Sequence, residues 1–120
     1  MPFRALLEEL VTTIDGAEGA ILIESDGEGV QWFARGDEGR LKLRAAYAAV
    51  VMRNAGEASA RLHLGQLARL VLEYEGARLV VEQIEKGYCV VVDLDPSANT
   101  AEAIHKLEPV AAVLRREILA

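Results

Sequence analysis

Cysteine and histidine, which enzymes use as nucleophiles, bases or metal ligands, occur at three positions in this 120-residue sequence. They are the only cysteine, Cys89, and the two histidines, His63 and His105. A catalytic nucleophile needs a base beside it, but no catalytic motif surrounds either histidine. His63 falls at a predicted helix end, and His105 falls within a predicted helix. Cys89 lies inside an apolar run, whereas a reactive thiolate needs exposure and positively charged neighbours. We therefore expect no catalytic residue and no enzymatic activity.

The acidic side chains Glu24, Asp26 and Glu28 alternate around Gly27 and Gly29, a pattern that suggests oxygen ligands for calcium. An EF-hand loop needs about twelve residues, with a late bidentate glutamate, between two helices. This segment is instead a short turn between two predicted strands. The glycines also make no phosphate-binding loop, because a third glycine and a following helix are absent. The sequence therefore predicts neither a metal site nor a cofactor.

The net charge of −6 at pH 7 argues against a nucleic-acid partner, which requires clustered Lys and Arg. Basic residues nevertheless gather locally at Arg35, Arg40, Lys42, Arg44 and Arg53. Charges on the solvated side of a helix are the simpler interpretation. The alternative is a surface for an anionic partner, for which Arg40, Lys42 and Arg44 are the candidates.

Nothing in the sequence predicts insertion into a membrane, because no apolar run reaches 18 residues. The N-terminal residues lack the charged, apolar and small-residue segments of a signal peptide. One cysteine cannot form an intrachain disulfide. We therefore expect a folded protein of the cytoplasm, with one domain spanning residues 1–120.

The elements that could position functional groups are organised around a helix at residues 41–52, which carries two apolar stripes. One stripe consists of Leu41, Ala45, Ala48 and Met52. The opposite stripe consists of Leu43, Tyr47 and Val50, together with Ala46 and Val51. A helix that is apolar on both sides must be covered twice, by its own sheet and by something else. We place the Tyr47 stripe outward, because aromatic residues with a polar tip are enriched at interface centres. The alanine-rich stripe is the alternative, because small residues allow close approach.

The rest of the sequence predicts two further helices and five strands. A helix covers residues 3–14, with Gly16 placed to end it. Strands follow at residues 20–24, 30–35, 66–74, 77–84 and 88–94, and the doubly striped helix extends from Glu38 towards Arg61. The last helix opens at residues 95–99, where Asn99 and Glu102 fit a capping box. Pro109 should kink or split this helix, because proline cannot donate a hydrogen bond to the carbonyl of residue 105.

Hairpins and hydrophobic alternation predict how the strands pair. Residues 20–24 and 88–94 are apolar on both faces and therefore lie at the centre of the sheet. The simplest strand order is 2-1-5-4-3, which leaves residues 66–74 at an edge. The predicted fold class is an α/β sandwich with the order α-β-β-α-β-β-β-α. Its five-stranded sheet, mixed or antiparallel, has two helices on one face and one on the other.

Short motifs spread over essentially the whole chain resemble the roadblock/LC7 family. They are Gly19-Ala20, Asp26-Gly27, Leu64-Gly65-Gln66-Leu67, Gly87 and Ala98-Asn99, in the family's order and spacing. The sequence departs from the family pattern at Ala101, where a glycine is expected, and at Pro109. The resemblance points to a bacterial or archaeal single-domain member, similar to the MglB-like proteins that regulate GTPases.

The resemblance implies a non-catalytic homodimer that binds or regulates a small Ras-like GTPase. Members of the family pair their second helices and join their third strands into one continuous sheet. An edge strand that few charges protect supports the same arrangement, because such an edge needs a partner strand. The predicted dimer interface consists of Leu43, Tyr47, Val50, Val51, Leu70 and Leu72.

A small-molecule sensor domain of the PAS or GAF type is the alternative function, because such domains also place a five-stranded sheet among helices. A sensor keeps a ligand cavity lined by polar groups. The strands of this sequence are instead filled with Val, Ile and Leu. An enzyme ranks third, for want of a catalytic set.

Overall fold

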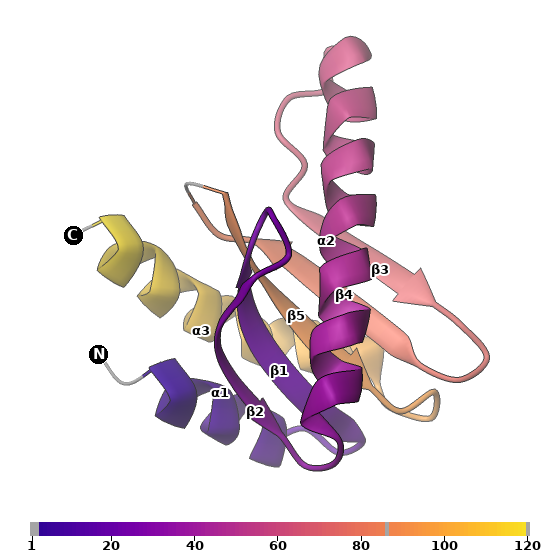
Figure 1. Ribbon diagram of the computed structural model, residues 1–120, viewed down its shortest axis with the longest axis vertical. Helices are drawn as coiled ribbons and strands as arrows, with labels where there is room; N and C mark the ends of the chain where they lie inside the picture. Colours follow the sequence, from indigo (N-terminus) through magenta and orange to yellow (C-terminus); the bar gives the residue numbers. More distant parts are fainter. Residues whose placement is uncertain (1–2, 86, 120) are drawn as a thin grey trace.

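The computed structural model describes residues 3–85 and 87–119 (Figure 1). Three helices and five strands follow one another in the predicted order. Their bounds are α1 (Phe3–Thr12), β1 (Ala17–Glu24), β2 (Gly29–Ala34), α2 (Glu38–Arg61), β3 (Arg69–Glu73), β4 (Arg78–Gln83), β5 (Tyr88–Leu94) and α3 (Thr100–Leu119).

The strands form one sheet in the order β2-β1-β5-β4-β3, as predicted, and every neighbouring pair is antiparallel. The bounds of β5 match the prediction, whereas β1 begins earlier because Ala17 pairs with Leu94 of β5. Strand β3 is shorter than the predicted residues 66–74. Its ladder with β4 spans only Arg69 to Glu73, so residues 66–68 form the approach to the strand.

Helices cover both faces of the sheet, with α1 and α3 on one side and α2 on the other (Figure 1). The core under α1 and α3 includes Leu7, Leu107 and Leu114, packed against residues such as Leu22 and Val90. The core under α2 is built on the alternate residues of the same strands, which include Ile21, Ile23, Val81 and Val91. The predicted two-to-one distribution of helices is confirmed.

Helix α2 begins after Asp37, whose side chain accepts a hydrogen bond from the Arg40 N–H (3.2 Å). A carboxylate in this position satisfies one of the free N–H groups of the first turn. The residues that α2 buries are Leu41, Ala45, Ala48, Ala49 and Met52. The alanine-rich stripe therefore lies on the sheet, while the C-terminal half of α2 projects past it (Figure 1).

Helix α3 is capped as expected at its start, where Asn99 Oδ1 accepts from the Glu102 N–H (3.0 Å). The Glu102 carboxylate contacts Lys106 (3.2 Å). The expected split at Pro109 is wrong, because one helix runs from Thr100 to Leu119. Pro109 and His105 both lie on the exposed side of the helix, where water can replace the missing hydrogen bond.

Replacing Gly56 with alanine should stabilise the protein. Gly56 lies inside α2, and a Cβ added there meets no atom within 4 Å. Alanine favours a helix over glycine by about 1 kcal/mol, so we expect a gain of up to that size in the free energy of unfolding. Urea denaturation measures the change.

Gly16→Ala is the matched control for this substitution. Gly16 has φ +85°, and its added Cβ would lie 2.9 Å from Ala98 Cβ. The same glycine-to-alanine exchange should therefore destabilise the protein at this position. A loss of stability in Gly56→Ala would contradict the open surroundings of Gly56.

Candidate interaction site

The side of α2 that faces away from the sheet exposes four large apolar side chains. They are Leu43 (60% exposed), Tyr47 (68%), Val50 (40%) and Val51 (38%), which we call the outer stripe. All four belong to the interface predicted from sequence. Isolated exposed apolar residues are ordinary on protein surfaces, whereas a contiguous group of this kind is typical of binding surfaces.

A groove of about 350 Å³ separates the outer stripe from the edge of the sheet. Its lining includes Leu43, Tyr47 and Val51 from α2 and Leu72 and Tyr74 from the end of β3. Leu70, the remaining residue of the predicted interface, is half-buried and packs with Leu72 against the core under α2. The apolar surface therefore continues from α2 to the edge strand.

The two edges of the sheet differ in how they are protected. On β2, the guanidinium of Arg4 in α1 donates to the Trp32 carbonyl (3.1 Å), and the β1–β2 ladder shifts register between Leu22 and Ile23. A capped carbonyl and a bulge both discourage strand addition. Strand β3 pairs with β4 alone in the described part of the chain. The sheet is thus open to a further strand on the β3 side.

The basic residues at the start of α2 have different surroundings. Arg40 is exposed. The Lys42 ammonium lies 3.7 Å from the centroid of the Trp32 ring, whose N–H donates to Glu38. Arg44 lies between α2 and the sheet. Of the three residues predicted to face a partner, Lys42 and Arg44 are therefore also engaged within the chain.

Arg44 forms a partly buried ion pair that the sequence analysis missed. Its Nη1 donates to both carboxylate oxygens of Asp93 in β5, at 3.1 and 3.0 Å. The Asp93 side chain is only 2% exposed, against 32% for Arg44. A carboxylate inside an otherwise apolar strand is the signal that could have revealed the pair, because a buried charge requires a partner.

A second buried carboxylate, Glu82 in β4, holds two arginines. Arg69 of β3 donates to it through Nε (2.6 Å), and Arg115 of α3 donates through Nη2 (3.3 Å). The hydrogen bond to Glu82 raises the pKa of Arg69, and so do the nearby charges of Glu82 and Glu108. This network ties the edge strand to α3, so β3 is held in place although one of its sides is unpaired.

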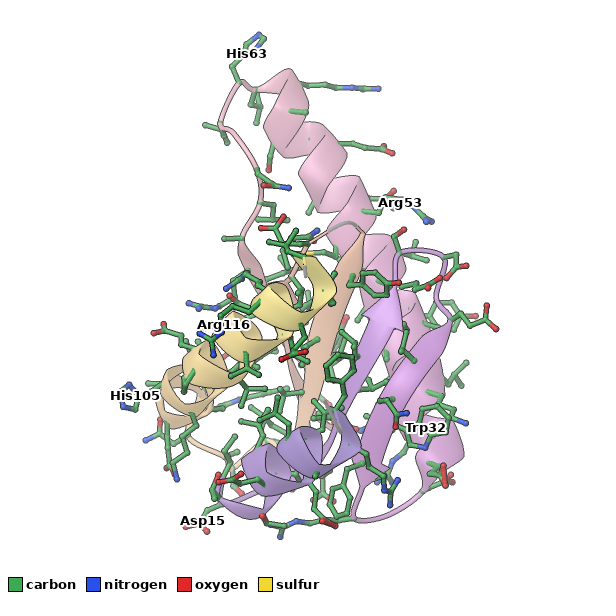
Figure 2. All side chains as sticks on the ribbon, turned by 90° about the vertical axis from the view of Figure 1, so that its left-hand side faces the viewer. Asp15, Trp32, Arg53, His63, His105 and Arg116 are labelled. Atoms are coloured by element: carbon green, nitrogen blue, oxygen red, sulfur yellow. The ribbon has the colours of Figure 1, made fainter. Side chains whose placement is uncertain are left out.

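The residues first considered for chemistry do not come together. Figure 2 shows His63 beyond the end of α2 and His105 on α3, in separate parts of the molecule. Cys89 is buried, and burial raises the pKa of its thiol to about 11. Within residues 3–85 and 87–119, no three His, Cys, Asp or Glu side chains gather into a group that could hold a metal ion. None of the helices in the same ranges is long and apolar enough to cross a membrane.

A hollow of about 710 Å³ lies beside the projecting half of α2. Gly56 and Met52 line it from α2, and Leu67, Gln83 and Cys89 line it from the approach to β3 and from the sheet. It is an open groove at the end of the sheet. The interiors above and below the central strands are filled by side chains.

Solved structures with the same fold include several roadblock/LC7 domains. A roadblock/LC7 domain from Streptomyces avermitilis superposes with a TM-score of 0.88, at 20% identity and over 98% of each chain. MglB from Myxococcus xanthus gives 0.84 at 13% identity, over 97% of this chain and 94% of its own. MglC from the same organism gives 0.73 at 25% identity, over 98% and 99%. No family model and no curated protein matches the sequence.

Arg44→Ala should destabilise the protein, because it leaves the Asp93 carboxylate buried without its partner. We expect a loss of about 2–3 kcal/mol in the free energy of unfolding, measured by urea denaturation. Arg40→Ala removes an equivalent charge from the exposed side of the same helix and should change stability by less than about 0.5 kcal/mol. Equal effects of the two substitutions would contradict the structural role of the ion pair.

Proposed function

We propose that this chain, which has the fold of the roadblock/LC7 domains, is a non-catalytic, homodimeric regulator that binds a small Ras-like GTPase in the cytoplasm. The proposal treats residues 1–120 as a single roadblock/LC7-like domain. The fold rests on the structural comparisons. The GTPase partner rests on the family resemblance, whereas dimerisation is also supported by the chain's own surface.

The observation that carries the dimer is the continuity of the outer stripe with an unprotected edge strand. Each feature alone would leave apolar or hydrogen-bonding groups in water. A two-fold axis beside β3 would place the outer stripes of two copies against each other and bring their edge strands together. Stable interfaces of this kind bury about 1,200 to 2,000 Å² in total, which suffices for a dimer at micromolar concentration.

The GTPase-binding surface is proposed on the basic start of α2, beside the dimer interface. Arg40, Lys42 and Arg44 lie there in a chain with a net charge of −6. A basic region on an acidic protein favours an anionic partner surface and speeds its association. Since Arg44 also neutralises Asp93, Arg40 and Lys42 are the better probes of partner binding.

A small-molecule sensor is the second candidate, and the hollow beside Gly56 is the observation in its favour. Its volume falls within the range of ligand pockets, roughly 300–1,000 Å³. The roadblock/LC7 fold and the filled space on both sides of the central strands favour the regulator. A large rise in melting temperature with one metabolite would favour the sensor instead.

Tyr47→Glu should convert the dimer into a monomer, because it buries a charge at the centre of the proposed interface. Light scattering at micromolar concentration measures the molar mass, and circular dichroism checks that the chain remains folded. Leu119→Glu is the control, because Leu119 is 54% exposed on α3, on the opposite side of the sheet. A stable Tyr47→Glu dimer would overturn the placement of the interface, and a monomeric parent protein would overturn the dimer.

The purified protein should retain a small Ras-like GTPase from lysate, and more of it with either GTP or GDP added. Mass spectrometry identifies the retained protein and compares the two nucleotides. The double variant Arg40→Glu/Lys42→Glu reverses two charges outside the outer stripe. It should remain a dimer but retain at least about tenfold less GTPase, if each charge contributes about 1 kcal/mol. Absence of any small GTPase in both nucleotide states would argue against this partner.

A further inference from the structure

We propose that the two copies of the chain join through β3 in one register, with Val71 opposite Val71 of the second copy. In this register Arg69 lies opposite Glu73 of the second copy, twice by symmetry. The inference rests on the proposed homodimer and adds the alignment of its strands. It follows from which residues of β3 turn their backbone N–H and C=O groups outward, and from the order of the charged residues along the strand.

The bonds flanking the β3–β4 ladder show which backbone groups of β3 point outward. The Ala68 carbonyl accepts from the Gln83 N–H, and the Tyr74 N–H donates to the Ala77 carbonyl, each at 2.9 Å. These two residue pairs follow the same register as the β3–β4 ladder that lies between them. Bonded and non-bonded pairs alternate along antiparallel strands. The even-numbered residues of β3 therefore bond to β4, and the odd-numbered residues turn their N–H and C=O groups outward.

The outward backbone groups belong to Arg69, Val71 and Glu73. An antiparallel neighbour related by a two-fold axis must pair these odd-numbered residues with one another. Only registers centred on residue 70, 71 or 72 do so with substantial overlap. The register centred on Val71 is the one that pairs all five residues of β3 with all five of the second copy.

Charge order favours the same register. Centring on Val71 sets Arg69 against Glu73 of the second copy, whereas centring on Leu70 sets Arg69 against Val71. Centring on Leu72 sets Glu73 against Val71, and Arg69 could then meet only Glu75, which lies beyond the end of β3. Opposite charges directly across antiparallel strands are favourable, while a charge facing valine gains no such pair. The sequence of β3, with arginine and glutamate two residues either side of a valine, is complementary to itself.

The side chains concerned are available for this contact. Arg69 reaches Glu82 through Nε and Glu108 through Nη2 (3.4 Å), and its Nη1 has no partner among the described residues. Glu73 is two-thirds exposed, and its nearest cation, Arg78, lies 3.8 Å away. Pairing with the second copy therefore requires neither side chain to abandon a short bond. On the other face of β3, Leu70 meets Leu72 of the second copy beneath the outer stripes.

Disulfide cross-linking of variants with a single cysteine in β3 tests the register directly. Cα atoms of a bonded antiparallel pair lie about 5.5 Å apart, which a disulfide can span. Val71→Cys should therefore form a cross-linked dimer under mild oxidation, since residue 71 meets its own copy. In the neighbouring registers the two cysteines would be displaced by about 7 Å along the strand. The unmodified chain, whose only thiol is the buried Cys89, is the control.

Cross-linking at neighbouring positions separates the possible failures. Efficient disulfide formation by Leu70→Cys or Leu72→Cys, with none by Val71→Cys, would overturn the register while leaving the homodimer intact. A dimer by light scattering that cross-links at none of the three positions would also overturn it. A monomeric parent protein would instead overturn the proposed homodimer.

Charge reversal provides an independent test by sedimentation. Glu73→Lys should raise the dimer dissociation constant about tenfold, because two like-charge pairs replace two opposite pairs. Glu75→Lys makes the same change two residues later and should leave the constant within about twofold. In the register centred on Leu72, Arg69 would face Glu75 of the second copy. The reverse ranking of the two variants would therefore overturn the proposed register.

Discussion

The sheet is wider than a single helix, and this difference determines where apolar side chains remain exposed on the surface of the protein. Five strands about 4.8 Å apart span about 20 Å, whereas a helix with its side chains is about 10–12 Å across. Two helices cover one face, but α2 alone covers the other. Its buried alanines let it lie close over the central strands, so the part of this face that it leaves uncovered lies beside β3. The groove and the half-buried leucines of the edge strand are the result of that incomplete cover.

Charged residues on the two faces of the sheet hold α2 and the edge strand in place. The ion pair between Arg44 and Asp93 joins α2 to β5, and Glu82 joins β3 to α3 through two arginines. Burying such an ion pair costs free energy, because both charges lose their water. Removing only one partner costs more than replacing both with apolar residues, because the remaining charge is then buried without water or a counter-charge. These pairs fix the position of α2 and of the edge strand relative to the central strands. The apolar surface between these elements therefore has a defined shape before any partner arrives.

Local sequence patterns predicted most of this fold, because each strand and helix shows its own periodicity. The order of the strands followed from the doubly apolar β1 and β5, and the extent of α2 followed from Asp37 and Arg61. The patterns could not decide which stripe of α2 meets the sheet, because both stripes have helical spacing. They also missed the contact between Arg44 and Asp93, which are 49 residues apart. The split expected at Pro109 was wrong, because the effect of the proline depends on whether the freed carbonyl faces water, which only the tertiary structure reveals. The interface residues remain a prediction, which rests on the apolar stripe in the sequence and on the exposure of the same side chains in the structure.

The contact from Arg4 to the Trp32 carbonyl has a consequence for assembly size. Sheets that are open at both edges can add copies without end and grow into filaments. A sheet with one open edge can add one copy by a two-fold axis, after which the outermost strands are the two capped β2 strands. A single arginine on the first helix would thus act as a terminator of polymerisation, at the opposite end of the sheet from the surface on which assembly begins.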